Sequence, residues 1–339
     1  MAGGSKTAVY TAIGANLIVT VAKFIGFALT GSGAMLSEAI HSVADVGNQT
    51  LLAVGMQKSL KPADEKHPYG YGLEAFVWSL ISAVGIFFVG CGFSMMHAIQ
   101  ALTEYFTGNP HAPEVGMLAI GILIFSLVIE FASLSIAMWG IWGQAKERDL
   151  SFAAHLRTTD DPFGVAILLE DSAAVLGVLI ALVAVVMNYL THDPIWDAIG
   201  TLLISLLLGF VALFLIAKNK SFLIGKAVAP KDKELIEKIV REDPVVESVK
   251  VTRATVRGTD HYRVSMEIDI DGGHIAELWL AQHDINEVHS ELGTPDALRA
   301  FLVEYGEEVM RITGDEIDRL ERTIQTAMPR AKSIDLEPD

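Results

Sequence analysis

Six long apolar stretches constrain this chain more than any other feature of its sequence. They cover roughly residues 8–30, 33–57, 74–99, 114–142, 163–190 and 194–218. An α-helix needs about 20 predominantly apolar residues to cross the hydrocarbon core of a bilayer. The first stretch is long and lacks a clear cationic start and a small-residue cleavage site, so we do not expect a cleaved signal peptide. The sequence therefore predicts an all-α polytopic membrane domain with six transmembrane helices.

The distribution of charge divides the chain into two parts. Only 19% of the 339 residues are charged, and they are concentrated after the sixth apolar stretch. We predict a membrane domain over residues 1–222 and a cytoplasmic C-terminal domain over residues 223–339. The net charge of −16 argues against nucleic acid as a partner. The single cysteine, Cys91, excludes disulfide frameworks and cysteine-based metal sites.

Every loop on one side of the predicted spans carries Lys or Arg, and the loops on the other side carry none. The cationic segments are the N-terminus with Lys6, residues 58–73, residues 143–162 with Arg148, and the exit after the sixth span; those without Lys or Arg lie near residues 30–33, 102–113 and 191–194. Loops with this excess of positive charge remain in the cytoplasm. We therefore expect a multi-pass protein of the cytoplasmic (inner) membrane with both termini in the cytoplasm.

The second apolar stretch carries polar residues at helical spacing. Glu38, His41, Asp45 and Asn48 follow one another at intervals of three, four and three, which places them on one stripe of a helix. Ionisable groups inside hydrocarbon are costly unless they are paired, hydrated or bound to metal. His41 and Asp45 are one turn apart, so their side chains can converge on one ion. An imidazole nitrogen with carboxylate oxygens suits Zn²⁺, and manganese, iron, cobalt or cadmium can use the same ligands.

The fifth apolar stretch supplies further candidate ligands. Two ligands from one helix cannot close the tetrahedron that Zn²⁺ prefers. Glu170 and Asp171 are adjacent in an otherwise apolar run, and we expect Asp171 as the third ligand, with Glu170, Asn48 or water as the fourth. A single intramembrane His or Asn usually makes a hydrogen bond between helices. Several acids in different spans are too costly for packing alone and favour a functional site.

Several segments carry a family resemblance when they are taken together. They are Asn16 and Lys23 in the first span, SGAMLSEAIHSVAD (32–45), LKPADEKHPYGYGLEA (60–75), LEDSAAVLGV (169–178) and DAIGTLLI (197–204). Over nearly its full length the chain resembles the cation diffusion facilitator family of metal–proton antiporters. The LLED run and Glu130 are similar to the branch that contains the mitochondrial zinc transporter nine of animals. With no evident transit peptide, the chain looks like a prokaryotic relative of that branch.

The resemblance implies a transport site built from the second and fifth spans. By position, its ligands fall on His41, Asp45 and Asp171. The remaining family position falls on Ile167, which cannot bind metal, so Glu170 is the expected replacement. A neighbouring residue on a helix points about 100° away, and Glu170 reaches the same ion only through its longer side chain or a local distortion.

The resemblance also implies a surface metal site and a folded tail. The surface site maps to Asp64 and His67, with Tyr71 in the third place, in the loop between the second and third spans. The tail is expected to be an α+β ferredoxin-like domain that forms a homodimer. Its sequence predicts helices over 230–242, 275–291 and 296–328, strands over 245–256, 261–270 and 331–338, and an added helical hairpin after Gly273. We interpret its histidines as solvated surface residues.

These observations predict proton-coupled efflux of a divalent cation, zinc first, with no permanently bound cofactor and no enzymatic activity. Metal and protons compete for the same ligands, and His41, which changes its charge near neutral pH, is the expected proton carrier. The alternatives are the same fold carrying Mn, Fe, Co or Cd, a membrane metal sensor that binds without transport, and an ion channel. An intramembrane metallohydrolase is disfavoured because the sequence has no His-Glu-x2-His motif and no nucleophile elbow.

Overall fold

The computed structural model describes residues 2–108, 117–147, 149–159 and 161–339, without the side chains of residues 2–13, 15, 118 and 162. The chain forms two compact units, Met1–Ile224 and Gly225–Asp339. Two cations that contribute to the predicted orientation, the Lys6 side chain and Arg148, lie outside the described part.

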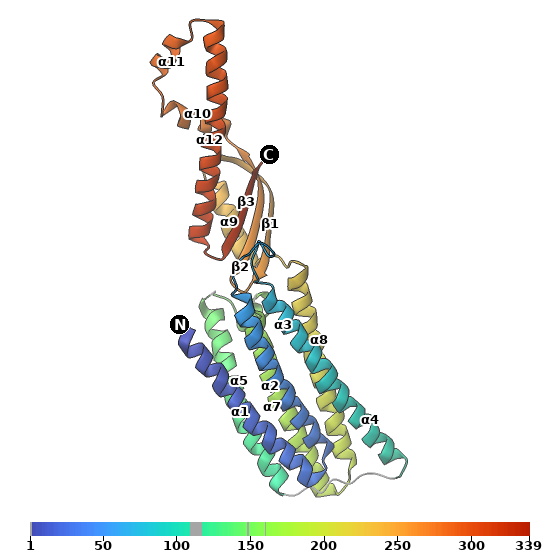
Figure 1. Ribbon diagram of the computed structural model, residues 1–339. Coiled ribbons are helices and arrows are strands. Elements are labelled where there is room, and N and C mark those ends of the chain that lie inside the picture. Colours follow the sequence, from blue (N-terminus) through green and yellow to red (C-terminus); the bar gives the residue numbers. More distant parts are fainter. Residues whose placement is uncertain (1, 109–116, 148, 160) are drawn as a thin grey trace. The chain divides into compact units, whose positions relative to one another are not determined.

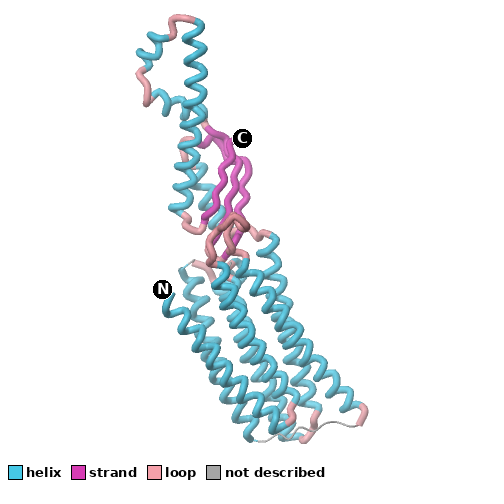
Figure 2. The backbone as a smooth tube through the Cα atoms, in the orientation of Figure 1, coloured by secondary structure: helices cyan, strands magenta, loops and turns pink. Residues whose placement is uncertain are grey.

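The first unit is a bundle of long helices (Figures 1 and 2). Its elements are α1 (Ala2–Thr30), α2 (Gly33–Ser59), α3 (Glu74–Gly85), the π-helix η1 (Ile86–Gly92), α4 (Phe93–Phe106), α5 (Met117–Glu147), the short α6 (Phe152–Thr158), α7 (Pro162–Thr191) and α8 (Ile195–Ile224). Elements α3, η1 and α4 form one continuous helical stretch.

Composition and length identify the helices that can cross a membrane. Among the described residues, four helical stretches are long and apolar enough: Glu74–Phe106, Ala119–Glu147, Phe163–Thr191 and Ile195–Ile224. The apolar part described for α1 is the shorter Asn16–Thr30, and α2 carries the polar stripe. The predicted all-α membrane domain is confirmed in its helical character, and these four stretches have the composition of membrane spans.

Side-chain caps fix where the helices of the bundle begin. Ser32 Oγ accepts a hydrogen bond from the Met35 N–H at the start of α2. The Asp197 carboxylate of α8 accepts from the Gly33 N–H at 2.6 Å and the Ala34 N–H at 3.3 Å. The first N–H groups of a helix have no partner within the helix, and these acceptors satisfy them. The start of α2, and with it the polar stripe, is thereby fixed relative to α8.

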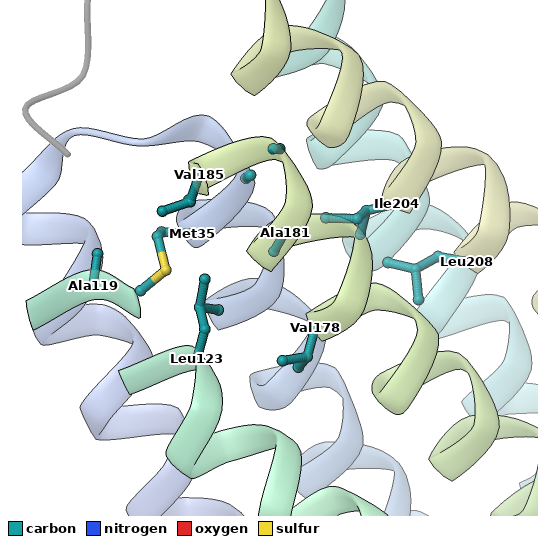
Figure 3. Packing of buried hydrophobic residues seen from close by; sticks show 10 residues of the cluster. Met35, Ala119, Leu123, Val178, Ala181, Val185, Ile204 and Leu208 are labelled. Atoms are coloured by element: carbon teal, nitrogen blue, oxygen red, sulfur yellow. The ribbon is translucent and has the colours of Figure 1, made fainter. Parts of the chain in front are cut away.

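An apolar cluster packs α2, α5, α7 and α8 together (Figure 3). Met35, Leu123 and Val178 are fully buried and point toward one another from three of these helices. Small residues allow close approach of α7 and α8, since a Cβ placed on Gly200 would lie 2.6 Å from Ala184 Cβ. Close backbone approach through small residues is the usual way in which helices pack in a membrane.

The third predicted span differs from expectation because a π-helix interrupts it. Residues Ile86–Gly92 form η1, which separates α3 from α4. Close packing against α8 occurs here, since a Cβ on Gly90 would lie 3.3 Å from Leu208 and one on Gly209 would lie 2.9 Å from Cys91 Sγ. A π-helix within an α-helix adds a residue to the turn and often marks a functional position.

The second unit contains a small mixed sheet with helices. Its elements are α9 (Pro230–Arg241), β1 (Val246–Gly258), β2 (His261–Ile270), α10 (Gly272–Leu280), α11 (Ile285–Glu291), α12 (Pro295–Ala327) and β3 (Ala331–Pro338). Strand β2 is central, antiparallel to β1 and parallel to β3. Alternate residues of β2, among them Tyr262, Val264 and Met266, are fully buried, as expected of a sheet with one covered face. The predicted α+β domain is confirmed.

The prediction of one helix over residues 275–291 is wrong. The structure has two helices there, because Asp271 caps α10 and Asp284 caps α11 by accepting hydrogen bonds from the N–H groups that follow each of them. Asp284 ends the helical run and leaves His283 in the connection. The His283 ring stacks on Trp279, with ring centroids 4.2 Å apart. Trp279 in turn makes edge contacts with Phe301 and Tyr305 of α12, and these contacts hold α10 against α12.

Candidate metal site

The polar stripe of α2 lies in the interior of the bundle. Glu38, His41, Asp45 and Asn48 are all buried, with at most 9% of each residue exposed. The spacing of three and four residues places them on one helical face, and the Ser32 side chain, which caps α2, fixes where that helix starts. Buried polar groups normally have hydrogen-bond partners, and those that lack one need an explanation.

His41 and Asp45 form the first half of the site. His41 Nδ1 lies 3.6 Å from Asp45 Oδ1, too far for a hydrogen bond. Among the described residues, neither ring nitrogen of His41 nor Asp45 Oδ1 has a hydrogen-bond partner. An imidazole and a carboxylate one turn apart, both buried and both with free acceptors, form half of a typical zinc-binding set.

Glu170 of α7 and Asn48 form the second half. The Asn48 side-chain N–H donates to Glu170 Oε2 and joins α2 to α7. In the described part of the chain, Asn48 Oδ1 and Glu170 Oε1 are left without hydrogen-bond partners. Glu170, which sequence reasoning placed about 100° from the expected ligand direction, therefore faces α2 in the structure. Its free oxygen and that of Asn48 are hard ligands suited to a divalent cation.

Asp171 and Ile167 lie on other sides of α7. Asp171 Oδ2 accepts a hydrogen bond of 2.8 Å from Ser133 Oγ of α5. Ile167 is 36% exposed and faces away from the interior, so the family position that falls on it lies outside the polar site. Asp171 and Glu170 are both within electrostatic range of Asp45. No three His, Cys, Asp or Glu side chains of the described residues converge closely enough to hold a metal ion as they stand.

The surface site predicted in the loop between α2 and α3 is occupied by an ion pair. Asp64 accepts hydrogen bonds from Lys61 Nζ at 2.9 Å and from the Tyr71 hydroxyl at 2.8 Å. These two hydrogen bonds hold the pKa of the Asp64 carboxyl well below its usual range. His67 Nδ1 is 3.6 Å from the same carboxylate. The structure brings Asp64 and His67 together, but the Lys61 ammonium already supplies the cation that the carboxylate would otherwise bind.

A further set of buried charges has no counterpart in the predicted ligand set. Lys23 of α1 makes ion pairs with Glu38 and Glu130. The sequence shows Lys23 and Glu130 as charged residues in apolar spans, but their spacing does not reveal that they are partners. Ser133, which binds Asp171, was also missed, because nothing distinguishes it in the sequence from other serines in the spans.

Comparison with known proteins identifies similar chains. The family model of the cation efflux transmembrane domain matches residues 9–224. The human protein "Proton-coupled zinc antiporter SLC30A9, mitochondrial" is 36% identical over 337 residues, which cover 98% of this chain and 58% of the human one. "Metal tolerance protein C4" of Arabidopsis thaliana is 37% identical over 339 residues, covering 98% of this chain and 73% of the plant protein. The chain thus spans little more than half the length of the human relative.

Proposed function

The chain belongs to the cation efflux family, and on that premise we propose that it exports a divalent metal ion, Zn²⁺ first, in exchange for protons. The observation that carries the proposal is the set of buried, unpartnered acceptors on His41, Asp45, Asn48 and Glu170. The name of the human relative describes zinc antiport coupled to protons, and this chemistry agrees with the ligand types. Mn, Fe, Co and Cd are the competing cargoes.

We assign the ligands from geometry and from family position together. His41 and Asp45 supply an imidazole nitrogen and a carboxylate oxygen from α2. Glu170 Oε1 and Asn48 Oδ1 face the same interior region, while Asp171, the family position, is bonded to Ser133 in this structure. Zn²⁺ takes four ligands at about 2.0–2.2 Å when they are nitrogen and oxygen. Small movements of α7 against α2 would bring the carboxylates onto one ion.

Proton exchange follows from the chemistry of these ligands. Imidazole and carboxylate bind metal only when deprotonated, so metal and protons exclude each other at the site. An ion that arrives from the cytoplasm displaces protons, and protons that enter from the opposite side displace the ion. We place both termini in the cytoplasm, because Lys61 and Lys66 in the loop between α2 and α3 and Lys146 in the last turn of α5 lie on one side of the predicted spans. From the family resemblance, we propose that the protein is a homodimer in the cytoplasmic membrane.

Reconstitution tests this function directly. Purified protein in liposomes should take up Zn²⁺ when a pH gradient is imposed, as measured with a zinc-sensitive dye trapped inside. His41→Ala and Asp45→Asn should each abolish uptake, because they remove ligands from the buried pair. Asp64→Asn is the matched control, since it removes an acid of the exposed loop, and it should leave uptake unchanged. Zinc binding without flux in the wild type would identify a sensor, and normal uptake by both ligand variants would refute the assignment.

A further inference from the structure

A second buried charge cluster lies beside the metal ligands. Lys23 Nζ is 2.9 Å from Glu38 Oε2 and 2.6 Å from Glu130 Oε1. The Lys23 and Glu38 side chains are fully buried, and the Glu130 side chain is 7% exposed. The three residues, called the Lys23 triad below, come from α1, α2 and α5 and connect these helices through charge-assisted hydrogen bonds.

The Lys23 triad has two carboxylates but one ammonium group. Fully ionised, it carries a charge of −1 in a site closed to water, and an uncompensated buried charge is strongly unfavourable. Glu38 Oε1 and Glu130 Oε2 have no hydrogen-bond partner within the described residues. One proton bound to either carboxylate would make the triad neutral and would supply a donor to this unsatisfied region.

Helix α7 packs closely against the Glu38 carboxylate of the triad. Glu38 Oε1 lies against Gly177 of α7, where a Cβ atom would collide with that oxygen. Glycine at this position therefore lets the carboxylate approach the α7 backbone. The other ionisable groups of these helices that interact with the triad are His41 and Asp45 of α2 and Asp171 of α7.

The triad is coupled electrostatically to the metal ligands and shares none of them. Glu38 lies one turn before His41 on the same stripe of α2. Lys23 is within electrostatic range of His41 and Asp45, and Glu130 is within range of Asp45 and Asp171. A divalent ion bound by His41 and Asp45 adds two positive charges close to the triad, and the attraction or repulsion between charges is strong where water is excluded.

We propose that the Lys23 triad is a proton-carrying site of the transporter, separate from the metal ligands. With the metal site empty, Glu38 and Glu130 hold one proton between them. When a divalent ion binds to the ligands, the carboxylic O–H bond breaks, the proton leaves to water, and the remaining carboxylate stays paired with the Lys23 ammonium. The inference rests on the proposed antiport, and it adds a source of exchanged protons beyond the ligands themselves.

The test counts protons moved per zinc ion. Zinc-sensitive and pH-sensitive dyes report both fluxes at once in liposomes that contain the full chain. Glu130→Gln and Glu38→Gln mimic the protonated acids permanently, so each should lower the ratio by about one proton per zinc. Zinc should still bind, weakened by at most about 10–100-fold, because neither residue is a ligand and each acts on the site only from outside. Glu104→Gln, which changes an acid of α4 outside the triad, is the matched control and should keep the wild-type ratio.

A second variant protects the test against loss of folding. Lys23→Arg keeps the positive charge, and the five N–H donors of a guanidinium can satisfy the oxygens that are free in the wild type. Because the triad still has two carboxylates and one cation, it should still hold one proton, and the ratio should keep its wild-type value. A lowered ratio in Lys23→Arg, or an unchanged ratio in every glutamine variant that folds, would overturn the proposal while leaving antiport intact. Absence of zinc flux in the wild type would instead overturn antiport, and this inference with it.

Discussion

Exchanging Glu170 for glutamine separates two ways of completing the metal site. In the structure, Glu170 faces Asn48 and keeps one free oxygen, whereas Asp171 is bonded to Ser133. Glu170→Gln and Asp171→Asn each remove one negative charge and keep the side-chain size, so they form a matched pair. If Glu170 is the inner ligand, its variant loses a direct metal–oxygen contact, while the Asp171 variant loses a charge outside the coordination sphere.

The expected magnitudes follow from that distinction. Changing a group that supports a metal ligand from outside typically costs 10–100-fold in metal affinity. Asp171→Asn should fall in this range, about 1.4–2.8 kcal/mol. Loss of the charged inner ligand should exceed it, so Glu170→Gln should weaken zinc binding by more than about 100-fold, or about 2.8 kcal/mol. Ser133→Ala removes only the bond that holds Asp171 and should change the affinity less than either variant.

The assay is a competition for Zn²⁺ between the purified protein in detergent and a chromophoric chelator. Thermal unfolding in the absence of metal controls for damage to the fold. A larger loss for Asp171→Asn than for Glu170→Gln would refute the reasoning. It would mean that Asp171 leaves Ser133 to bind the ion and that Glu170 serves mainly as the acceptor for Asn48.

Three further outcomes follow from contacts elsewhere. The pair between Asp243 and Arg319, at 2.7–2.9 Å, should make Asp243→Asn destabilising by about 1–2 kcal/mol at pH 7. Partial burial of Asp243 favours its neutral form, but the Arg319 hydrogen bonds prevail and lower the pKa of this carboxyl. The pair therefore stabilises the fold fully above about pH 4. The difference in stability between wild type and Asp243→Asn, measured by amide hydrogen exchange, should vanish as the pH falls through the lowered pKa of Asp243. Trp279→Ala should cost about 3–5 kcal/mol and expose α10 and the adjoining part of α12 to protease, because this buried ring is the centre of their aromatic contact. Gly200→Val should reduce the yield of monodisperse protein in size-exclusion chromatography, since the first added carbon already meets Ala184; Gly121→Val is the control, because no atom of the described residues lies within 4 Å of a Cβ placed there.

The sequence predicted the elements of the fold more reliably than their details. Apolar runs located the long helices, and period-two alternation located β1 and β2, while residues 331–338 were expected as the last strand. The helices extend past the apolar runs because length in a helix is set by caps and packing as well as by hydrophobicity. Thus α8 ends at Ile224, six residues beyond the predicted end at 218. The interruption at Asp284 was readable as a helix cap, but the π-helix at Ile86–Gly92 depends on packing against α8, which no local pattern encodes.

The candidate site, too, was predictable from the sequence only in part. Helical periodicity alone places His41, Asp45 and Asn48 on one face, because all three lie on one helix. Whether Glu170 or Asp171 faces that stripe depends on the rotation of α7, and close contacts with other helices set that rotation. The pairing of Lys23 with Glu130 joins residues 107 positions apart, and a single sequence gives no distance between them.

The wide turn at Ile86–Gly92 has a consequence for how the helix that contains it is built. A π turn holds one residue more than an α turn, so the part of the helix after it is rotated by about 100° relative to an uninterrupted helix. An uninterrupted α-helix of the same sequence would turn α4 by that amount and carry His97, which now packs over Gly33 at the start of α2, around to another side; deleting one residue within 86–92 should instead convert the π turn into an α turn and leave His97 over Gly33. The extra residue thus sets which side of α4 meets its neighbours. Helices α3 and α4, before and after the π turn, present side chains in directions that one uninterrupted α-helix would not combine.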